Sequence, residues 1–86
     1  MTILVVDDSK TIHSLVKELL NEFGKIKLCH AYDGQEAIDF IELSTSQNLK
    51  LVLMDWEMPI MSGIDALPEL KKRKPDLPIL MMTSKN

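Results

Sequence analysis

The hydrophobic and polar residues of this chain alternate between two patterns. Four short apolar or alternating runs of strand length lie at residues 2–6, 25–31, 51–54 and 79–82. Between them, apolar residues recur at spacings of three and four, which predicts helices over residues 9–23, around 37–41, and from Ser62 or Gly63 through Leu70. Strands that alternate with helices indicate an α/β fold, with a parallel sheet, right-handed crossovers and helices on both faces.

Composition narrows the kind of protein. The length of 86 residues allows one small domain, and 45% hydrophobic with 27% charged residues is ordinary for a globular protein. The net charge of −3 argues against direct nucleic-acid contact, and the basic run at residues 71–74 suits a helix C-terminus. We see no signal peptide, no membrane-length apolar run, and no disulfide partner for the single Cys29. We therefore expect a cytoplasmic protein without membrane contact.

Polar side chains follow three of the predicted strands. Asp7 and Asp8 follow the first strand, Asp55 the third and Thr83 the fourth. Open α/β sheets place ligands at the carboxyl ends of their strands, so these side chains converge if the three strands are neighbours. For Asp55 there is an alternative, because an aspartate in this place can also cap the following helix.

The converging groups suit metal-assisted phosphoryl chemistry. Three carboxylates in close contact repel one another unless a cation lies among them, and carboxylate oxygens are preferred ligands of Mg²⁺. Such an ion would also neutralise an incoming phosphoryl group, whose oxygens the Thr83 hydroxyl could bind. The pattern therefore predicts phosphoryl transfer onto a carboxylate, with Asp55 as the nucleophile.

Five short motifs carry a resemblance to a known family. They are V-V-D-D-S at residues 5–9, A-Y-D-G-Q-E-A at 31–37, L-M-D-W-E-M-P at 53–59, M-S-G at 61–63 and M-T-S at 82–84. They run through the whole chain, which resembles the receiver domains of bacterial two-component response regulators, the chemotaxis-regulator-like family. The resemblance implies the flavodoxin-like receiver fold, here with strand order 2-1-3-4.

The resemblance also implies a role for each site residue. Asp55 would accept a phosphoryl group from a histidine kinase or phosphotransfer protein, and Thr83 would contact that group and act in the conformational switch. Asp7, Asp8 and Asp55 would bind Mg²⁺ together with the backbone carbonyl of Glu57. A receiver is a phosphoacceptor signalling module with at most autophosphatase activity, so we expect no enzyme with an external substrate.

The resemblance covers only the first part of the family pattern. We expect a single receiver domain over residues 1–86, truncated before the fourth helix, fifth strand and fifth helix. An essential lysine of the fifth strand is missing with them, so Asp55 in this chain is expected to become phosphorylated slowly or not at all. Residues 79–82 would then form an edge strand beside an uncovered sheet face, which predicts self-association as a homodimer.

Two other functional classes stay open. A phosphatase of the haloacid-dehalogenase type uses an aspartyl phosphate but has D-x-D at its nucleophile, where this chain has D-W-E at residues 55–57. The chain could also be a receiver fragment that is unable to switch and acts as a folding or self-association unit. Away from the acidic residues, we expect a surface His13, no metal site around Cys29 and His30, and a partly exposed Trp56.

Overall fold

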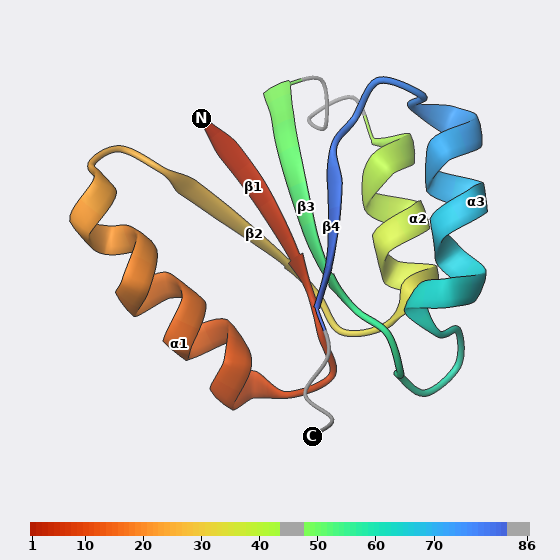
Figure 1. Cartoon of the computed structure of the whole chain (residues 1–86), viewed down its shortest axis with the longest axis horizontal. Helices are drawn as coiled ribbons and strands as arrows, with labels where there is room; N and C mark the ends of the chain where they lie inside the picture. The colour runs from red at the N-terminus through yellow and green to blue at the C-terminus, as the bar shows by residue number, and fades with distance from the viewer. Residues whose placement is uncertain (44–47, 83–86) are drawn as a thin grey trace.

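A parallel sheet with helices on both faces forms the fold, and the computed structural model describes residues 1–43 and 48–82. Its four strands, in the order β2-β1-β3-β4, are β1 (Thr2–Val6), β2 (Lys27–Ala31), β3 (Leu49–Asp55) and β4 (Ile79–Met82). Helix α1 (Lys10–Leu20) and the 3-10 helix η1 (Asn21–Phe23) lie on one side, and α2 (Gly34–Glu42) and α3 (Gly63–Arg73) lie on the other (Figure 1). The predicted α/β fold with a parallel sheet of strand order 2-1-3-4 is confirmed.

Each α-helix begins at a side chain that accepts a hydrogen bond from the first turn. The caps are Ser9 for α1, Asp33 for α2 and Ser62 for α3. Such caps satisfy backbone donors that have no partner within the helix. Because Ser62 caps α3, the alternative interpretation of Asp55 as a helix cap is wrong.

Among the residues that the structure describes, no helix is both long and apolar enough to span a membrane.

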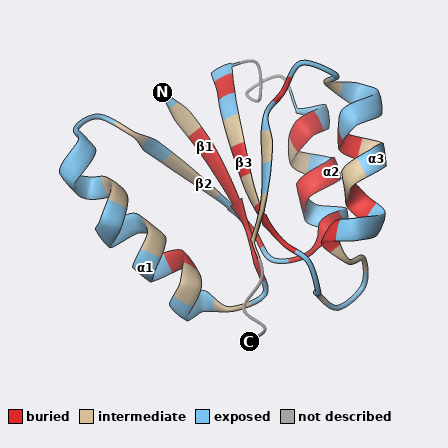
Figure 2. Cartoon of the chain, in the orientation of Figure 1, coloured by how far each residue is buried: buried red, intermediate tan, exposed pale blue. Residues whose placement is uncertain are grey.

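The hydrophobic core lies between the sheet and the layer formed by α2 and α3, where Figure 2 shows the buried residues gathered. Alternate residues of the strands point into this core, and the fully buried ones are Leu4, Val6, Val52 and Met54. The helices contribute Ala37, Ile38, Ala66 and Leu70. Apolar burial of this kind is the main source of stability in a small domain.

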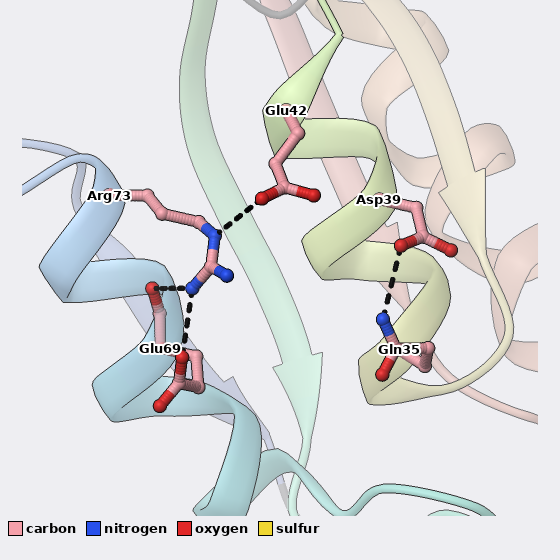
Figure 3. Close-up of polar contacts among 5 residues, drawn as sticks. All are labelled: Gln35, Asp39, Glu42, Glu69 and Arg73. Atoms are coloured by element: carbon pink, nitrogen blue, oxygen red, sulfur yellow. Dashed lines mark hydrogen bonds and ion pairs between the residues drawn. The ribbon is translucent and has the colours of Figure 1, made fainter.

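Arg73 joins the C-terminal ends of α2 and α3. Its Nε lies 3.1 Å from Oε2 of Glu42 in α2, and its Nη1 lies 2.9 Å from Oε1 of Glu69 one turn earlier in α3 (Figure 3). Both carboxylates are substantially exposed, so solvent screening keeps their contribution to stability small. The contact therefore links the two helices at the surface but adds little to the stability of the fold.

The other face of the sheet is covered less completely. Helix α1 has a single buried residue, His13, while Leu15 and Leu19 are 49% and 58% exposed. Phe23 in η1 is 73% exposed, and Leu80, which points away from the main core, is 58% exposed. Exposed apolar side chains therefore remain on α1, η1 and β4, which we call the open apolar surface. Figure 2 shows that most of α1 is exposed or only partly buried.

Candidate functional site

The register of the parallel strands brings three carboxylates together at the carboxyl ends of β1 and β3. Val6 is paired with Met54, so the residues that follow them, Asp7 and Asp55, come side by side. Asp8 comes directly after Asp7 in the chain. One carboxylate oxygen from each of the three residues lies within 4.8 Å of the others. We call Asp7, Asp8 and Asp55 the aspartate cluster.

The members of the aspartate cluster differ in burial and so in electrostatic environment. Asp7 and Asp55 are 5% and 7% exposed, whereas Asp8 faces solvent. Burial raises the pKa of Asp7, a hydrogen bond from the Ser9 backbone N–H opposes the rise, and the charges of Asp55 and Asp8 add to it. A cation close to Asp7 would therefore offset the cost of its buried negative charge.

Hydrogen bonds from three directions hold Asp7 at the end of β1. Its backbone N–H donates to the carbonyl of Ala31 in β2 at 3.1 Å, and its carboxylate accepts from the Ser9 N–H at 2.8 Å. Its carbonyl oxygen lies 2.7 Å from Nε2 of His13. The expectation of a surface His13 is wrong, because this ring is only 4% exposed and packs against Tyr32 with ring centroids 4.4 Å apart.

The loop after Asp55 folds closely over the end of β3. Gly63 donates its N–H to the carbonyl of Trp56 at 2.9 Å, and Trp56 donates its own N–H to the carbonyl of Met82 at 3.1 Å. A Cβ atom on Gly63 would lie 1.9 Å from the carbonyl oxygen of Asp55, so only glycine fits there. The indole of Trp56 is 46% exposed, as predicted. Glu57, predicted to offer its carbonyl as a ligand, follows in this loop with an exposed side chain.

The predicted phosphoryl contact, Thr83, lies outside the described residues. The last described residue of β4 is Met82, which is paired with Asp55 in the strand register. The structure therefore assembles the aspartate cluster and places the loop that contains Glu57 beside it. The contribution of Thr83 stays a prediction from the sequence.

Ile60, in the same loop, should destabilise the fold through its backbone conformation. It has a φ of 68°, and its side chain is 84% exposed. The left-handed region costs a residue with a Cβ about 1–2 kcal/mol, and it is especially unfavourable for β-branched side chains. Asparagine tolerates this region, so Ile60→Asn should raise the free energy of unfolding, measured by urea denaturation, by about 1 kcal/mol. Ile60→Val keeps the strain and should show no gain; an equal gain in both variants would contradict the interpretation.

Comparison with known proteins gives concordant matches. The chain matches the response regulator receiver domain family over residues 3–86. A chemotaxis protein CheY homolog of Campylobacter jejuni is 35% identical over 86 residues, which cover 98% of this chain and 65% of the relative. The chemotaxis protein CheY of Pseudomonas aeruginosa is 37% identical over 86 residues, covering 98% of this chain and 67% of the relative.

Solved structures agree with these matches. The response regulator protein TrrA from Thermotoga maritima, in complex with Mg²⁺-BeF, has a TM-score of 0.84 and 39% identity, covering 99% of this chain and 70% of that chain. A receiver domain protein (CheY-like) from Methanospirillum hungatei has a TM-score of 0.85 at 28% identity, covering 99% and 65%. The chain thus spans about two thirds of the length of the curated relatives it matches.

Proposed function

We propose that this chain, which belongs to the response regulator receiver domain family, accepts a phosphoryl group on Asp55 in a phosphorelay. The donor would be a histidine kinase or a phosphotransfer protein in the cytoplasm. The observation that carries the proposal is the aspartate cluster, whose carboxylate oxygens lie within 4.8 Å of one another at the strand ends. The chain would act as a signalling module whose output is a change of conformation, without an external substrate of its own.

The aspartate cluster fits a magnesium ion. Its donors are hard carboxylate oxygens, and the raised pKa of the buried Asp7 reflects burial beside two like charges, which a cation would offset. The three carboxylates would hold the ion, with the backbone carbonyl of Glu57 as a further protein ligand. When bound, the ion would neutralise charge on the oxygens of the phosphoryl group.

Asp55 would act as the nucleophile. One of its carboxylate oxygens attacks the phosphorus atom of a phosphohistidine, so that an O–P bond forms while the P–N bond breaks and the imidazole leaves. The strand end and the loop hydrogen bonds around Trp56 hold the attacking residue in place. Thr83 would bind the transferred group and act in the switch, and hydrolysis of the acyl phosphate would be the only reaction that the module catalyses itself.

Acetyl phosphate with Mg²⁺ tests this function by intact-mass measurement and peptide mapping. We expect metal-dependent addition of one phosphoryl group, located at Asp55. Asp55→Asn should not react. Turnover of a phosphate ester such as p-nitrophenyl phosphate would favour the phosphatase alternative, and no modification at all would favour a receiver fragment that cannot switch.

We further propose that the chain forms a homodimer through the open apolar surface and the β4 edge. Leu80 lies mid-strand in β4, which pairs only with β3 among the described residues, and it is 58% exposed. A charge there should oppose strand pairing and apolar contact, so Leu80→Lys should shift the chain toward the monomer in light scattering after size exclusion. Leu43→Lys is the matched control, because Leu43 is 56% exposed and lies outside β4. A monodisperse wild-type monomer at tens of micromolar would contradict the proposal.

A further inference from the structure

A pair of histidines connects α1, β2 and the aspartate cluster. Nδ1 of His13 in α1 lies 2.7 Å from Nδ1 of His30 in β2. The other ring nitrogen of His13, Nε2, lies 2.7 Å from the carbonyl oxygen of Asp7. A chain of short hydrogen bonds therefore runs from the surface of β2, through the one buried side chain of α1, to the backbone of the cluster.

The positions of the protons in this chain follow from the acceptors. A carbonyl oxygen can only accept, so Nε2 of His13 carries a hydrogen and donates it to Asp7. The bond between the two Nδ1 atoms needs one donor and one acceptor, and a His13 ring that already donates from Nε2 can accept at Nδ1 when His30 donates from its own Nδ1. The pKa of His30 is lowered by burial, by His13 and by the charge of Lys17, which favours the neutral ring at neutral pH.

The geometry suits a hydrogen bond better than a metal ion shared by the two rings. The ring centroids are 4.9 Å apart although the facing nitrogens are 2.7 Å apart, so the rings meet almost end to end across the two nitrogens. Two rings that bound one ion would instead both point a nitrogen lone pair at that ion, which would lie to one side of the line joining the two nitrogens. Lys17 also places a positive charge near His30, which disfavours a cation there.

The histidine pair closes a ring of contacts around Asp7. The backbone N–H of Asp7 donates to Ala31, which is the neighbour of His30 in β2. Its carbonyl accepts from His13, which is in turn bonded to His30. His13 is the one buried residue of α1, and Leu15 and Leu19 are 49% and 58% exposed, so this ring of contacts helps to attach the helix to the sheet.

We propose that His13 is a positioning residue for metal binding by the aspartate cluster, and that His30 holds His13 in the tautomer that this role requires. The inference rests on the proposed function, since its consequence is measured as Mg²⁺ affinity. Removing the His13 donor leaves the Asp7 carbonyl without its side-chain partner and loosens α1, so the carboxylates that follow β1 lose their fixed placement.

Two measurements test the positioning role on the 86-residue chain. The first needs no metal: long-range ¹⁵N–¹H spectra should show His13 protonated at Nε2 and bare at Nδ1, and His30 protonated at Nδ1. The second is Mg²⁺ titration followed by Trp56 fluorescence. His13→Leu should weaken binding about tenfold, the loss typical of an outer-shell partner of a metal ligand. His13→Gln can keep a donor near the Nε2 position and should stay close to wild type.

The outcomes separate the two claims. A wild-type chain with no saturable Mg²⁺ binding would overturn the proposed function. Wild-type binding together with unchanged affinity in a folded His13→Leu chain would overturn the positioning role alone, and so would a His13 ring protonated at Nδ1 and bare at Nε2. If His13→Leu does not fold, His30→Ala takes its place, because it removes only the exposed partner; weaker binding supports the role and unchanged affinity overturns it.

Discussion

Asp8→Ala should abolish the change in Trp56 fluorescence that Mg²⁺ produces in the wild-type chain. Asp8 is the exposed member of the aspartate cluster, and its carboxylate lies within 4.8 Å of both others. Outer-shell changes already weaken metal binding by about 10–100-fold, so loss of a ligand should take the affinity beyond the range of a titration. Trp56 reports the event because it follows Asp55 directly and is 46% exposed.

The stability of the metal-free chain provides the control for Asp8→Ala. The pKa of Asp7 is raised on folding, mainly by burial and partly by the charges of Asp55 and Asp8. The free energy of unfolding therefore falls as the pH rises from the pKa of Asp7 in the unfolded chain to its higher pKa in the folded chain. Removing the charge of Asp8 lessens this loss, and the metal-free variant should unfold no earlier than wild type at pH 7. Asp76→Ala, an exposed aspartate outside the cluster, should keep the Mg²⁺ response. A saturable response in Asp8→Ala would contradict the ligand assignment.

Gly63→Ala should destabilise the chain more than an alanine at either of the other two glycines. The added Cβ would lie 1.9 Å from the carbonyl oxygen and 3.0 Å from the carbonyl carbon of Asp55, both of them backbone atoms. Relieving that clash requires moving the end of β3 or the start of α3, where Ser62 caps the helix. We expect a loss on the order of 3 kcal/mol or more, a large part of the stability of a small domain.

Urea denaturation followed by circular dichroism measures this loss, and Gly24→Ala is the matched control. Gly24 has a φ of 90°, and a methyl group added to it would meet no atom within 4 Å, so its alanine variant has strain without a clash. It should lose about 1–3 kcal/mol, less than Gly63→Ala. A Gly63→Ala chain within about 1 kcal/mol of wild type would show that the close approach of loop and strand is wrong.

The arrangement of strands and the aspartate cluster could be predicted because both depend on local patterns. Apolar runs of strand length indicated the four strands, and Ser9 and Ser62 marked the starts of two helices. Parallel strands end at the same edge of a sheet, so residues that follow neighbouring strands must come together. Asp7 and Asp55 do so through a register that pairs Val6 with Met54.

The histidine pair was missed because each histidine looks ordinary in its own segment. His13 follows Ile12 on an amphipathic helix, and His30 alternates with Leu28 on an edge strand. Only the packing of α1 against β2 shows that the two rings meet, and that packing depends on a helix orientation that periodicity does not give. The sequence nevertheless contained a signal. A polar residue beside the apolar stripe of a helix, such as His13, can form a hydrogen bond with a polar residue on the strand face toward that helix, such as His30.

The loop between Asp55 and α3 was also beyond pattern reasoning. Pro59 is incompatible with a regular continuation of the strand. The positive φ of Ile60, however, contradicts the preference of a β-branched residue. Such conformations are imposed by surrounding contacts, here the backbone hydrogen bonds of Met61 to Pro59 and of Gly34 to Met61. Tertiary contacts of this kind cannot be read from residue preferences alone.

We propose that the three strand-end carboxylates form one divalent-cation site around Asp55. The most direct test is a crystal of the chain grown with Mn²⁺, a substitute for Mg²⁺ whose position anomalous diffraction reveals. We expect one anomalous peak within about 2.0–2.3 Å of carboxylate oxygens from Asp8 and Asp55. A well-ordered aspartate cluster with no peak, or with the ion bound elsewhere on the chain, would contradict it.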